Sequence, residues 1–447
     1  MAMREVAVIG AGVSGLAAAF RLQQAGFKPK LFEGSDHVGG RTLSTTRDGF
    51  IIDRGAGILP SRYTNLLKLV EEAGLGHILV PASGVFGFGQ SDGSVTYLSA
   101  ERQLRDALKF PLSTRSKITA VKLLVDAARS SRKLSFEDLS LAASLDTESA
   151  GDYARRRLNT ELLERLVDPT VRGLAGTTAD DISNVDFFFA LLKFLGSKFV
   201  AFRDGMCSYS TELSARFDVE LNALVSHVEE IEDHVEVHWS DANGVERHSE
   251  AAGCVLAVPA SQVPSLYPQM DLWRSEFLDG VRYTKLVGVH VALSKPPKNV
   301  PAACVLLPKA VHPGLIAMVL EHLKAPGRAP AGKGLVGFFT DNGWAEELMD
   351  SDDDVVIKEL VSGGERFLPG VSNDIEFAVV SRWNEVVLHA RPGHYGGLRT
   401  FVELSKSKDK LIQLGGDFFS SANVNTATAG GERAARDLLA VLRIRSG

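Results

Sequence analysis

The sequence predicts an α/β fold in which a Rossmann-like domain is joined to a discontinuous second domain of mixed sheet with a helical insert. Three observations support this prediction. A buried strand, a glycine-rich turn and a helix follow one another near the start of the chain. Residues 114–195 have mostly helical periodicity, whereas strand-like and helical stretches alternate over residues 281–387. Such alternation is typical of an α/β protein.

The composition limits the class of protein. The chain has 447 residues, of which 45% are hydrophobic and 23% charged, as in a soluble globular protein of more than one domain. Its formal net charge of −6 provides no basic surface for nucleic acid, which is not expected as a partner. Three widely spaced cysteines without a CxxC pair argue against a zinc or disulfide framework and favour a cytoplasmic protein with reduced thiols.

The first motif lies between a strand at residues 5–9 and a helix at residues 15–25. It is a G-x-G-x-x-G turn that consists of Gly10, Ala11, Gly12, Val13, Ser14 and Gly15. The first glycine permits the tight turn, the second lets a pyrophosphate approach the backbone, and the third lets the helix pack on the strand. The helix then offers free N–H groups and the positive end of its dipole to phosphates.

A second short strand follows this helix and ends at Glu33. A carboxylate at this position can accept hydrogen bonds from the ribose hydroxyls of an adenosine. Strand, glycines, helix, strand and acid therefore occur in the order that a dinucleotide-binding unit requires. This motif alone does not separate NAD from FAD.

Further segments identify the dinucleotide through a resemblance. Gly39-Gly40-Arg41 is followed by "GFIIDRGAG", and the chain closes with "LGGDFFSSANVNTATAGGERAARDLLAVL". Together these segments resemble the flavin amine oxidase, protoporphyrinogen oxidase and phytoene desaturase superfamily. The resemblance implies a glutathione-reductase-type FAD-binding domain, in which Asp417 meets the ribityl–pyrophosphate region. A helix starting near Asn425 would aim its N-terminus at the flavin N1–O2 edge, where reduced flavin carries negative charge.

The resemblance implies a set of cofactor-contacting residues along the whole chain. The FAD is expected to be non-covalent, because residues 388–393 contain no cysteine. The expected contacts are Gly10, Ala11, Gly12, Val13, Ser14, Gly15, Glu33, Gly40, Arg41, Gly55, Ala56, Gly57, Ile58, Val228, Asp417, Val424, Asn425 and Thr426.

The same resemblance implies the domain organisation. Residues 1–85, 201–275 and 391–447 would form the FAD-binding domain. Residues 86–200 would form the helical insert and the first part of the substrate domain, and residues 276–390 its mixed sheet. Within the insert, "ESAGDYARRR" and "PTVRG" resemble the protoporphyrinogen oxidase branch. An amphipathic helix with a charged outer face predicts the same residues and remains an alternative.

The superfamily's chemistry is the removal of hydride from a C–C or C–N single bond to flavin N5. The cofactor carries this reaction, so no metal or nucleophile motif is expected, and H-E-x-x-H and G-x-S-x-G are absent from the sequence. Many amine oxidases of the superfamily place a lysine near N5. Alignment of "GVHVALSKP" places Gly288 at that position, while Lys285 faces elsewhere unless the alignment slips. The catalytic residues stay undetermined, with His389 and Arg391 as candidates for substrate contact and surface or core pairing as their alternative role.

We therefore expect an FAD-dependent oxidoreductase that acts on a small, fairly apolar organic molecule, in the manner of a protoporphyrinogen oxidase or a desaturase. Two alternatives remain: a flavin amine oxidase with an atypical site that lacks the N5 lysine, and a non-catalytic binding protein of the same fold. Oxygen or a quinone would accept the electrons. The sequence leaves open the substrate, the oligomeric state and a peripheral membrane contact of the helical insert.

Overall fold

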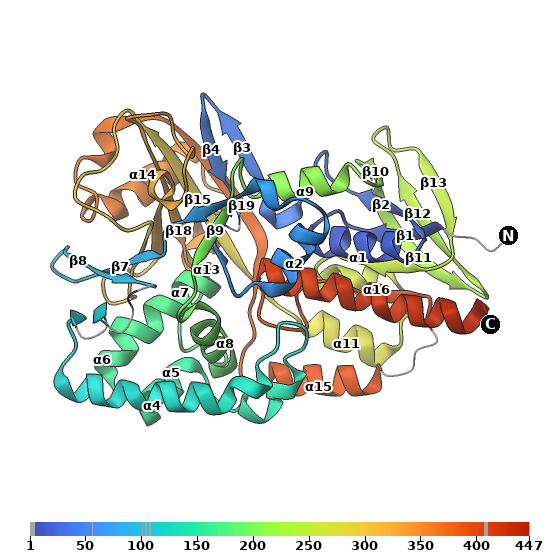
Figure 1. Cartoon of the computed structure of the whole chain (residues 1–447), viewed down its shortest axis with the longest axis horizontal. Helices are drawn as coiled ribbons and strands as arrows, with labels where there is room; N and C mark the ends of the chain where they lie inside the picture. Colours follow the sequence, from blue (N-terminus) through green and yellow to red (C-terminus); the bar gives the residue numbers. More distant parts are fainter. Residues whose placement is uncertain are drawn as a thin grey trace.

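The computed structural model of the chain describes residues 5–55, 57–100, 102, 105–106, 109–405 and 410–446 (Figure 1). Two lobes lie side by side in this view. The first and last long helices belong to one lobe, and the green-to-cyan helices and a large sheet form the other. The α/β fold class expected from the sequence is confirmed.

The first lobe is built on a parallel sheet whose strands come from distant parts of the chain. In the described residues its order is β10 (Asp218–Leu221), β2 (Lys28–Glu33), β1 (Glu5–Ile9), β14 (Cys254–Leu256) and β20 (Ile412–Leu414). Every neighbouring pair is parallel. Residues 6–9 are buried, as expected for a central parallel strand that is covered on both faces.

Helices α1 (Val13–Gln24) and α16 (Val424–Ser446) pack against each other beside this sheet (Figure 1). Glycines permit the close approach. A Cβ atom on Gly431 would lie 2.0 Å from the carbonyl oxygen of Ser14, and one on Gly430 would lie 1.9 Å from that of Gly416. The last helix is therefore held against the glycine-rich turn at the start of the first helix.

A smaller antiparallel sheet flanks the same lobe. It consists of β11 (Leu224–Ile231), β12 (His234–Ser240) and β13 (Glu246–Ala251). Val235, Val237 and Trp239 of β12 are buried, and the Trp239 ring lies 5.5 Å from that of Phe32 in β2. Alternate side chains of β12 therefore pack on the first lobe, and those between them face outward.

The second lobe contains a mixed sheet, as the sequence predicts. Its described strands run in the order β19 (Ile375–Leu388), β15 (Tyr283–Leu293), β18 (Gly334–Thr340), β17 (Leu315–Leu320), β16 (Cys304–Leu306), β7 (Val85–Gly89) and β8 (Val95–Ser99). The β16–β7 pair is parallel and the other neighbours are antiparallel. Helix α14 (Asp353–Glu365) covers one face, where Val356 and Leu360 join Phe338 in a buried cluster.

A group of helices lies below this sheet in Figure 1. It consists of α4 (Thr114–Ser130), α5 (Ala150–Arg157), α6 (Thr160–Leu162), α7 (Asp168–Ala175) and α8 (Asn184–Phe194). Ser113, Ser149 and Ser183 cap α4, α5 and α8, since each side-chain oxygen accepts a backbone N–H of the first turn. The three successive arginines of α5 form surface ion pairs with Asp180, Glu148 and Asp126. They thus form the charged outer face that the sequence left as an alternative.

Shorter elements connect these layers. They are β3 (Ser44–Arg47), β4 (Phe50–Asp53), β5 (Leu59–Pro60), α2 (Thr64–Glu72), β6 (Leu79–Ala82), β9 (Phe199–Phe202), α9 (Cys207–Ser214), α10 (Val263–Leu266), α11 (Leu272–Gly280), α12 (Glu321–Lys324), α13 (Asn342–Leu348) and α15 (His394–Leu404). Among the helices of the described ranges, none has both the length and the apolar character needed to cross a membrane.

Candidate functional site

A cavity of about 820 Å³ extends from the glycine-rich turn after β1 to the mixed sheet and helices α7 and α8. Both lobes supply its walls. One end is lined by backbone and polar side chains of the first lobe, and the other end mainly by apolar side chains of the second. Pockets of this kind, with a few convergent polar groups, are the usual sites for cofactors and small molecules.

The glycine-rich turn forms the first wall. Gly10, Gly12, Val13 and Ser14 line the cavity. Gly10 has a φ of 95°, and a Cβ atom on Gly15 would lie 1.9 Å from the carbonyl oxygen of Gly10. The space beside the Cα atom of Gly12 is open within 4 Å. Gly15 therefore shapes the turn without lining the cavity, while Gly12 leaves a cradle into which a phosphate fits.

Glu33 lies at the end of β2 and also lines the cavity. Its Oε2 accepts the N–H of Ala11 at 2.8 Å, and its Oε1 accepts the N–H and the hydroxyl of Ser35 at 3.0 and 2.7 Å. The side chain of Ala11 is buried away from the cavity. The carboxylate is therefore fixed between two turns, at the position where a ribose is expected.

Near this end lies the predicted contact Val228. Val228 is fully buried and does not line the cavity, whereas Val225, Ala223 and Leu224 do. A β-bulge interrupts the β11–β12 pairing between Val225 and His227. Val225 and Val228 both lie on the buried face of β11, and Val225 is the one of the two that lines the cavity.

Arg41 and Asp417 form an ion pair in the middle of the cavity, with 2.9 Å between Nη2 and Oδ2. Arg41 also donates from Nη1 to the carbonyl oxygen of Val386 at 2.8 Å. Burial by itself would lower the pKa of Arg41, but Asp417, Tyr283 and Glu385 together raise it. The other carboxylate oxygen of Asp417 is buried and accepts no hydrogen bond from the described residues. This oxygen remains available to a hydroxyl of a bound cofactor.

The turn after β4 passes next to this pair. Gly40, Gly55, Gly57 and Ile58 line the cavity, whereas the predicted contact Ala56 lies outside the described residues. A Cβ atom on Gly55 would lie 2.1 Å from the carbonyl oxygen of Arg41, so only glycine fits there. Trp383 lines the cavity beside this turn and donates from Nε1 to the carbonyl oxygen of Arg54 at 2.9 Å.

Helix α16 begins at Val424, and its N-terminus faces the cavity through Asn423, Val424 and Ala427. The Asn423 carboxamide oxygen accepts the N–H of Thr426 at 2.9 Å, as an N-cap does. Of the predicted contacts Val424, Asn425 and Thr426, only Val424 lines the cavity. Asn425 accepts the N–H of Leu66 of helix α2, and Thr426 donates its hydroxyl to the carbonyl oxygen of Ser421. Each helical residue turns by about 100° from the previous one, which carries these two side chains away from the cavity.

The far end of the cavity is apolar. Its walls come from α7, α8 and the mixed sheet, and include Val171, Leu174, Phe187, Phe189, Phe194, Cys304, Ile316, Ala317, Val319 and Phe339. Leu286 of β15 lines this chamber and Lys285 does not. A Cβ atom on Gly288 would lie 3.1 Å from the ring of Phe339. The aromatic ring therefore fills the space that a side chain at position 288 would enter.

A cluster of buried charged side chains, which sequence analysis did not single out, also lines the cavity. Lys324 of α12 lies 2.9 Å from Asp53 and 2.5 Å from Glu321, and Arg328 lies 3.1 Å from Asp53. Burial favours protonated Asp53, but Lys324 and Arg328 outweigh burial and lower its pKa. Burial raises the pKa of Glu321 in spite of Lys324. The spacing of Glu321 and Lys324 on one helical turn is visible in the sequence, but their contact with Asp53 is not.

Asp186, in the first turn of α8, is a second cavity-lining carboxyl group that sequence analysis did not single out. Tyr395 donates its hydroxyl to Oδ1 at 2.8 Å. Burial raises the pKa of Asp186 to about 7, opposed by hydrogen bonds from Ser421 and Tyr395 and assisted by the nearby Asp146. This carboxyl group can therefore hold or release a proton near neutral pH.

The two candidates for substrate contact lie outside the cavity. The Nε2 atom of His389 lies 3.0 Å from the carbonyl oxygen of Asp181, and the side chain of Arg391 is exposed. His389 and Arg391 thus take the pairing and surface roles that the sequence left as their alternative.

The parallel sheet, the glycine-rich turn, Glu33 and the helix aimed at the cavity together define a dinucleotide-binding fold. The sequence model of the flavin containing amine oxidoreductase family matches residues 13–439. The chain belongs to this family, as the resemblance implied, and a flavin is its cofactor.

Relatives cover the chain to different extents. Coproporphyrinogen III oxidase from Bacillus subtilis is 23% identical over 98% of both chains. Mitochondrial protoporphyrinogen oxidase from Nicotiana tabacum is 32% identical over 182 residues, which are 40% of this chain and 34% of that protein. Among solved structures, cyclohexylamine oxidase from Brevibacterium oxydans covers 100% of both chains with a TM-score of 0.78 at 17% identity. A putative protoporphyrinogen oxidase from Exiguobacterium covers 98% of both chains with a TM-score of 0.76 at 19% identity.

Proposed function

We propose that this chain binds FAD non-covalently and oxidises a C–C or C–N single bond of an apolar organic substrate. One observation carries this proposal: a single cavity joins the glycine-rich turn and Glu33 to an apolar chamber between the two lobes. When bound, the flavin supplies the hydride acceptor. The protein contributes the binding of both molecules and the exclusion of water.

The residues of the polar end fit FAD as follows. Glu33 and Val225 would hold the adenosine, and the N–H groups at Gly12 and Ser14 would bind the pyrophosphate. The free carboxylate oxygen of Asp417 would accept a hydroxyl of the ribityl chain. The N-terminus of α16, capped by Asn423, would stabilise negative charge at the ring.

Non-covalent binding is supported by the cysteines. Cys304 lines the cavity, but burial raises the pKa of its thiol to about 12. A thiol that stays protonated at neutral pH is a poor nucleophile toward a flavin. Acid precipitation should therefore release all flavin into the supernatant. Yellow colour that remains in the pellet would contradict non-covalent binding.

The apolar chamber supports a ring-containing or polyene substrate over a simple amine. The Phe339 ring occupies the space beside Gly288, and Lys285 does not line the cavity. Lys324 also lines the cavity, but its charge is paired with Asp53 and Glu321. Relatives named for porphyrinogen oxidation and for 4,4'-diapophytoene desaturation fit this substrate class.

Asp186 is the residue that we assign to proton transfer in this chamber, since its carboxyl group lines the cavity and Tyr395 orients it. The test is anaerobic bleaching of the flavin by porphyrinogens, polyenes, cyclic ketones and primary amines. We expect bleaching by a larger apolar molecule and not by simple amines. Bleaching by amines alone would establish the amine oxidase alternative, and a purified protein without a flavin spectrum would establish the non-catalytic one.

Oxygen or a quinone is the proposed electron acceptor, and the cytoplasm the proposed location. Helix α4 supports a peripheral membrane contact, because Ile118, Val121 and Leu124 are 67%, 57% and 44% exposed. Arg115 and Lys122 of the same helix would favour an anionic lipid surface. Flotation with anionic vesicles, compared between the wild type and Val121→Glu, tests this contact. Equal flotation of both proteins would contradict it.

A further inference from the structure

The outward face of the sheet β11–β13 carries one row of histidine and one row of glutamate side chains. His227, His238 and His248 are direct neighbours across the three strands. Glu229, Glu236 and Glu250 form the adjacent row. Side chains two residues apart on a strand share a face, so the histidine and glutamate rows lie next to each other.

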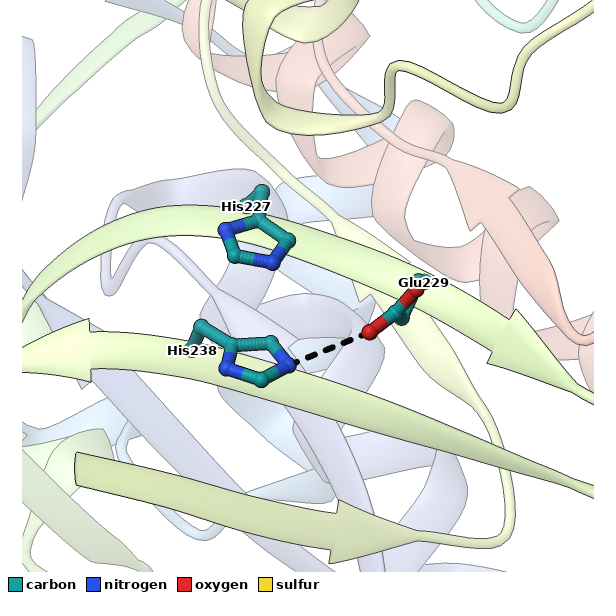
Figure 2. Close-up of side chains that lie close together, drawn as sticks. All are labelled: His227, Glu229 and His238. Atoms are coloured by element: carbon teal, nitrogen blue, oxygen red, sulfur yellow. Dashed lines mark ion pairs between the residues drawn. The ribbon is translucent and has the colours of Figure 1, made fainter.

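The ligand atoms of His227, Glu229 and His238 all lie within 4.8 Å of one another. Figure 2 shows the two imidazoles facing each other from neighbouring strands, with Glu229 directed toward His238. The imidazole centroids are 4.1 Å apart, and the rings are nearly parallel at 7°. His238 Nε2 lies 3.3 Å from Glu229 Oε1 and 3.4 Å from Glu236 Oε2.

These separations match the coordination geometry of zinc. Bonds of about 2.0–2.1 Å in a tetrahedral site place neighbouring ligand atoms about 3.3 Å apart. The His238–Glu229 distance already has this value. The ligand nitrogen of His227 starts within 4.8 Å of the other two ligand atoms, and in the proposed site its side chain rotates to reach the ion.

The backbone under this cluster is held in place. Val228, Val235 and Val237, on the opposite face of the same strands, are fully buried. The side chains of His238, Glu229 and Glu236 are 28%, 32% and 26% exposed, so they are partly shielded from water but reachable by an ion. A rigid backbone lowers the entropic cost of bringing the ligands together.

We propose that His227, His238 and Glu229 bind one Zn²⁺ ion on the outward face of this sheet, with water as the fourth ligand. Two imidazoles, one carboxylate and a water are a donor set that zinc accepts. None of the three residues lines the cavity, so the ion lies away from the cavity and joins β11 to β12. The pattern escapes sequence analysis because the ligands come from two strands without the spacing of a known zinc motif.

Without an ion, the same distances describe a His238 side chain in contact with two carboxylates, and the experiment separates the two states. Untagged holoprotein is treated with a chelator and titrated with ZnCl₂ by calorimetry, with thermal unfolding measured in parallel. We expect one ion per chain and a higher melting temperature with zinc, since binding to the folded state stabilises it. His227→Gln and His238→Gln should each weaken zinc binding by at least about tenfold.

Two matched variants locate the ion. His234→Gln changes a histidine on the same face that is grouped instead with Glu236 and Glu250, and His77→Gln changes a remote one paired with Glu212. Both should bind zinc as the wild type does. The flavin spectrum and the melting temperature without zinc show that each variant is folded. No zinc binding by the wild type, equal binding by His227→Gln and His238→Gln, or loss in His234→Gln alone would each overturn the proposal.

Discussion

Arg41 and Asp417 contact each other at 2.9 Å inside the cavity, so that segments from the two ends of the chain meet beside the cofactor site. Asp417 is 5% exposed and Arg41 is 29% exposed. Breaking a fully buried pair by removing one charge costs about 3–5 kcal/mol. Solvent nevertheless reaches the Arg41 side chain, and this partial exposure reduces the cost of breaking the pair.

Asp417→Asn should therefore lower the free energy of unfolding by on the order of 1–3 kcal/mol. Urea unfolding of the variant and the wild type measures the difference. Asp437→Asn is the control, because Asp437 pairs with Arg436 at 3.7 Å on the surface and should matter little. Equal effects of both substitutions would show that the Arg41–Asp417 pair does not stabilise the fold.

Glu33→Gln should weaken FAD retention. The substitution removes charge-assisted hydrogen bonds worth about 1.5–3 kcal/mol, which corresponds to a roughly 10- to 150-fold higher Kd. The Gln side chain still offers an oxygen to the N–H of Ala11, so the turn should keep its shape. Fluorescence titration of the apoprotein with FAD gives the Kd, and an unchanged value would mean that Glu33 does not bind the ribose.

Asn423→Asp should lower the reduction potential of the flavin. The N-cap position lines the cavity, and an added negative charge there opposes the charge on reduced flavin. A charge at a helix terminus is worth about 0.3–1 kcal/mol, or roughly 6–20 mV for a two-electron couple. Asn425→Asp is the matched control, because this side chain faces Leu66 instead and should shift the potential less. A larger shift in the control would place the flavin elsewhere.

Lys285→Met should leave reduction of the flavin within a few-fold of the wild type, because Lys285 does not line the cavity. Stopped-flow measurement of the reductive half-reaction with the identified substrate tests this. A loss of about 100-fold, equal to about 2.7 kcal/mol of transition-state stabilisation, would restore the amine oxidase alternative.

Asp186→Asn should change how stability depends on pH. Because burial raises the pKa of Asp186 to about 7, the folded protein holds this proton more tightly than the unfolded chain does. The corresponding stability is present at low pH and is lost as the pH rises from about 4 to 7. At pH 8 the variant avoids the cost of a buried charge, up to about 4 kcal/mol, against about 0.3–1 kcal/mol lost at the start of α8.

Urea unfolding at pH 5 and pH 8 measures this effect. Between the two values, the wild type should lose more stability than Asp186→Asn. The rate of flavin reduction in the wild type should also depend on a group with a pKa near 7, and this dependence should disappear in the variant. Parallel pH profiles for the two proteins would rule out Asp186 as the titrating group.

The dinucleotide-binding unit could be predicted from the sequence because its determinants are local. The spacing of Gly10, Gly12 and Gly15 fixes the turn, and Glu33 follows at the end of the next strand. Asp417 could also be predicted, because it directly follows the glycine pair of the closing segment. In each case a few consecutive residues determine both the backbone conformation and the chemistry.

Only the tertiary structure decided which neighbouring side chains face the cavity. Val225 lines the cavity and Val228 does not, and Asn423, just before α16, lines it while Thr426 does not. Side-chain direction changes by about 100° per residue in a helix and reverses at each residue in a strand, so a small error in phase points to the wrong residue.

The sequence by itself thus determined the class of fold, the cofactor-binding turn and the acid at the end of β2. The tertiary structure decided the pairing of Asp53 with Lys324 and the assembly of His227 with His238. The two residues of each pair lie on separate strands or helices, and no fixed spacing in the sequence connects them. Burial and strand pairing bring such residues together only when the whole chain packs, and this long-range packing is what a local pattern does not encode.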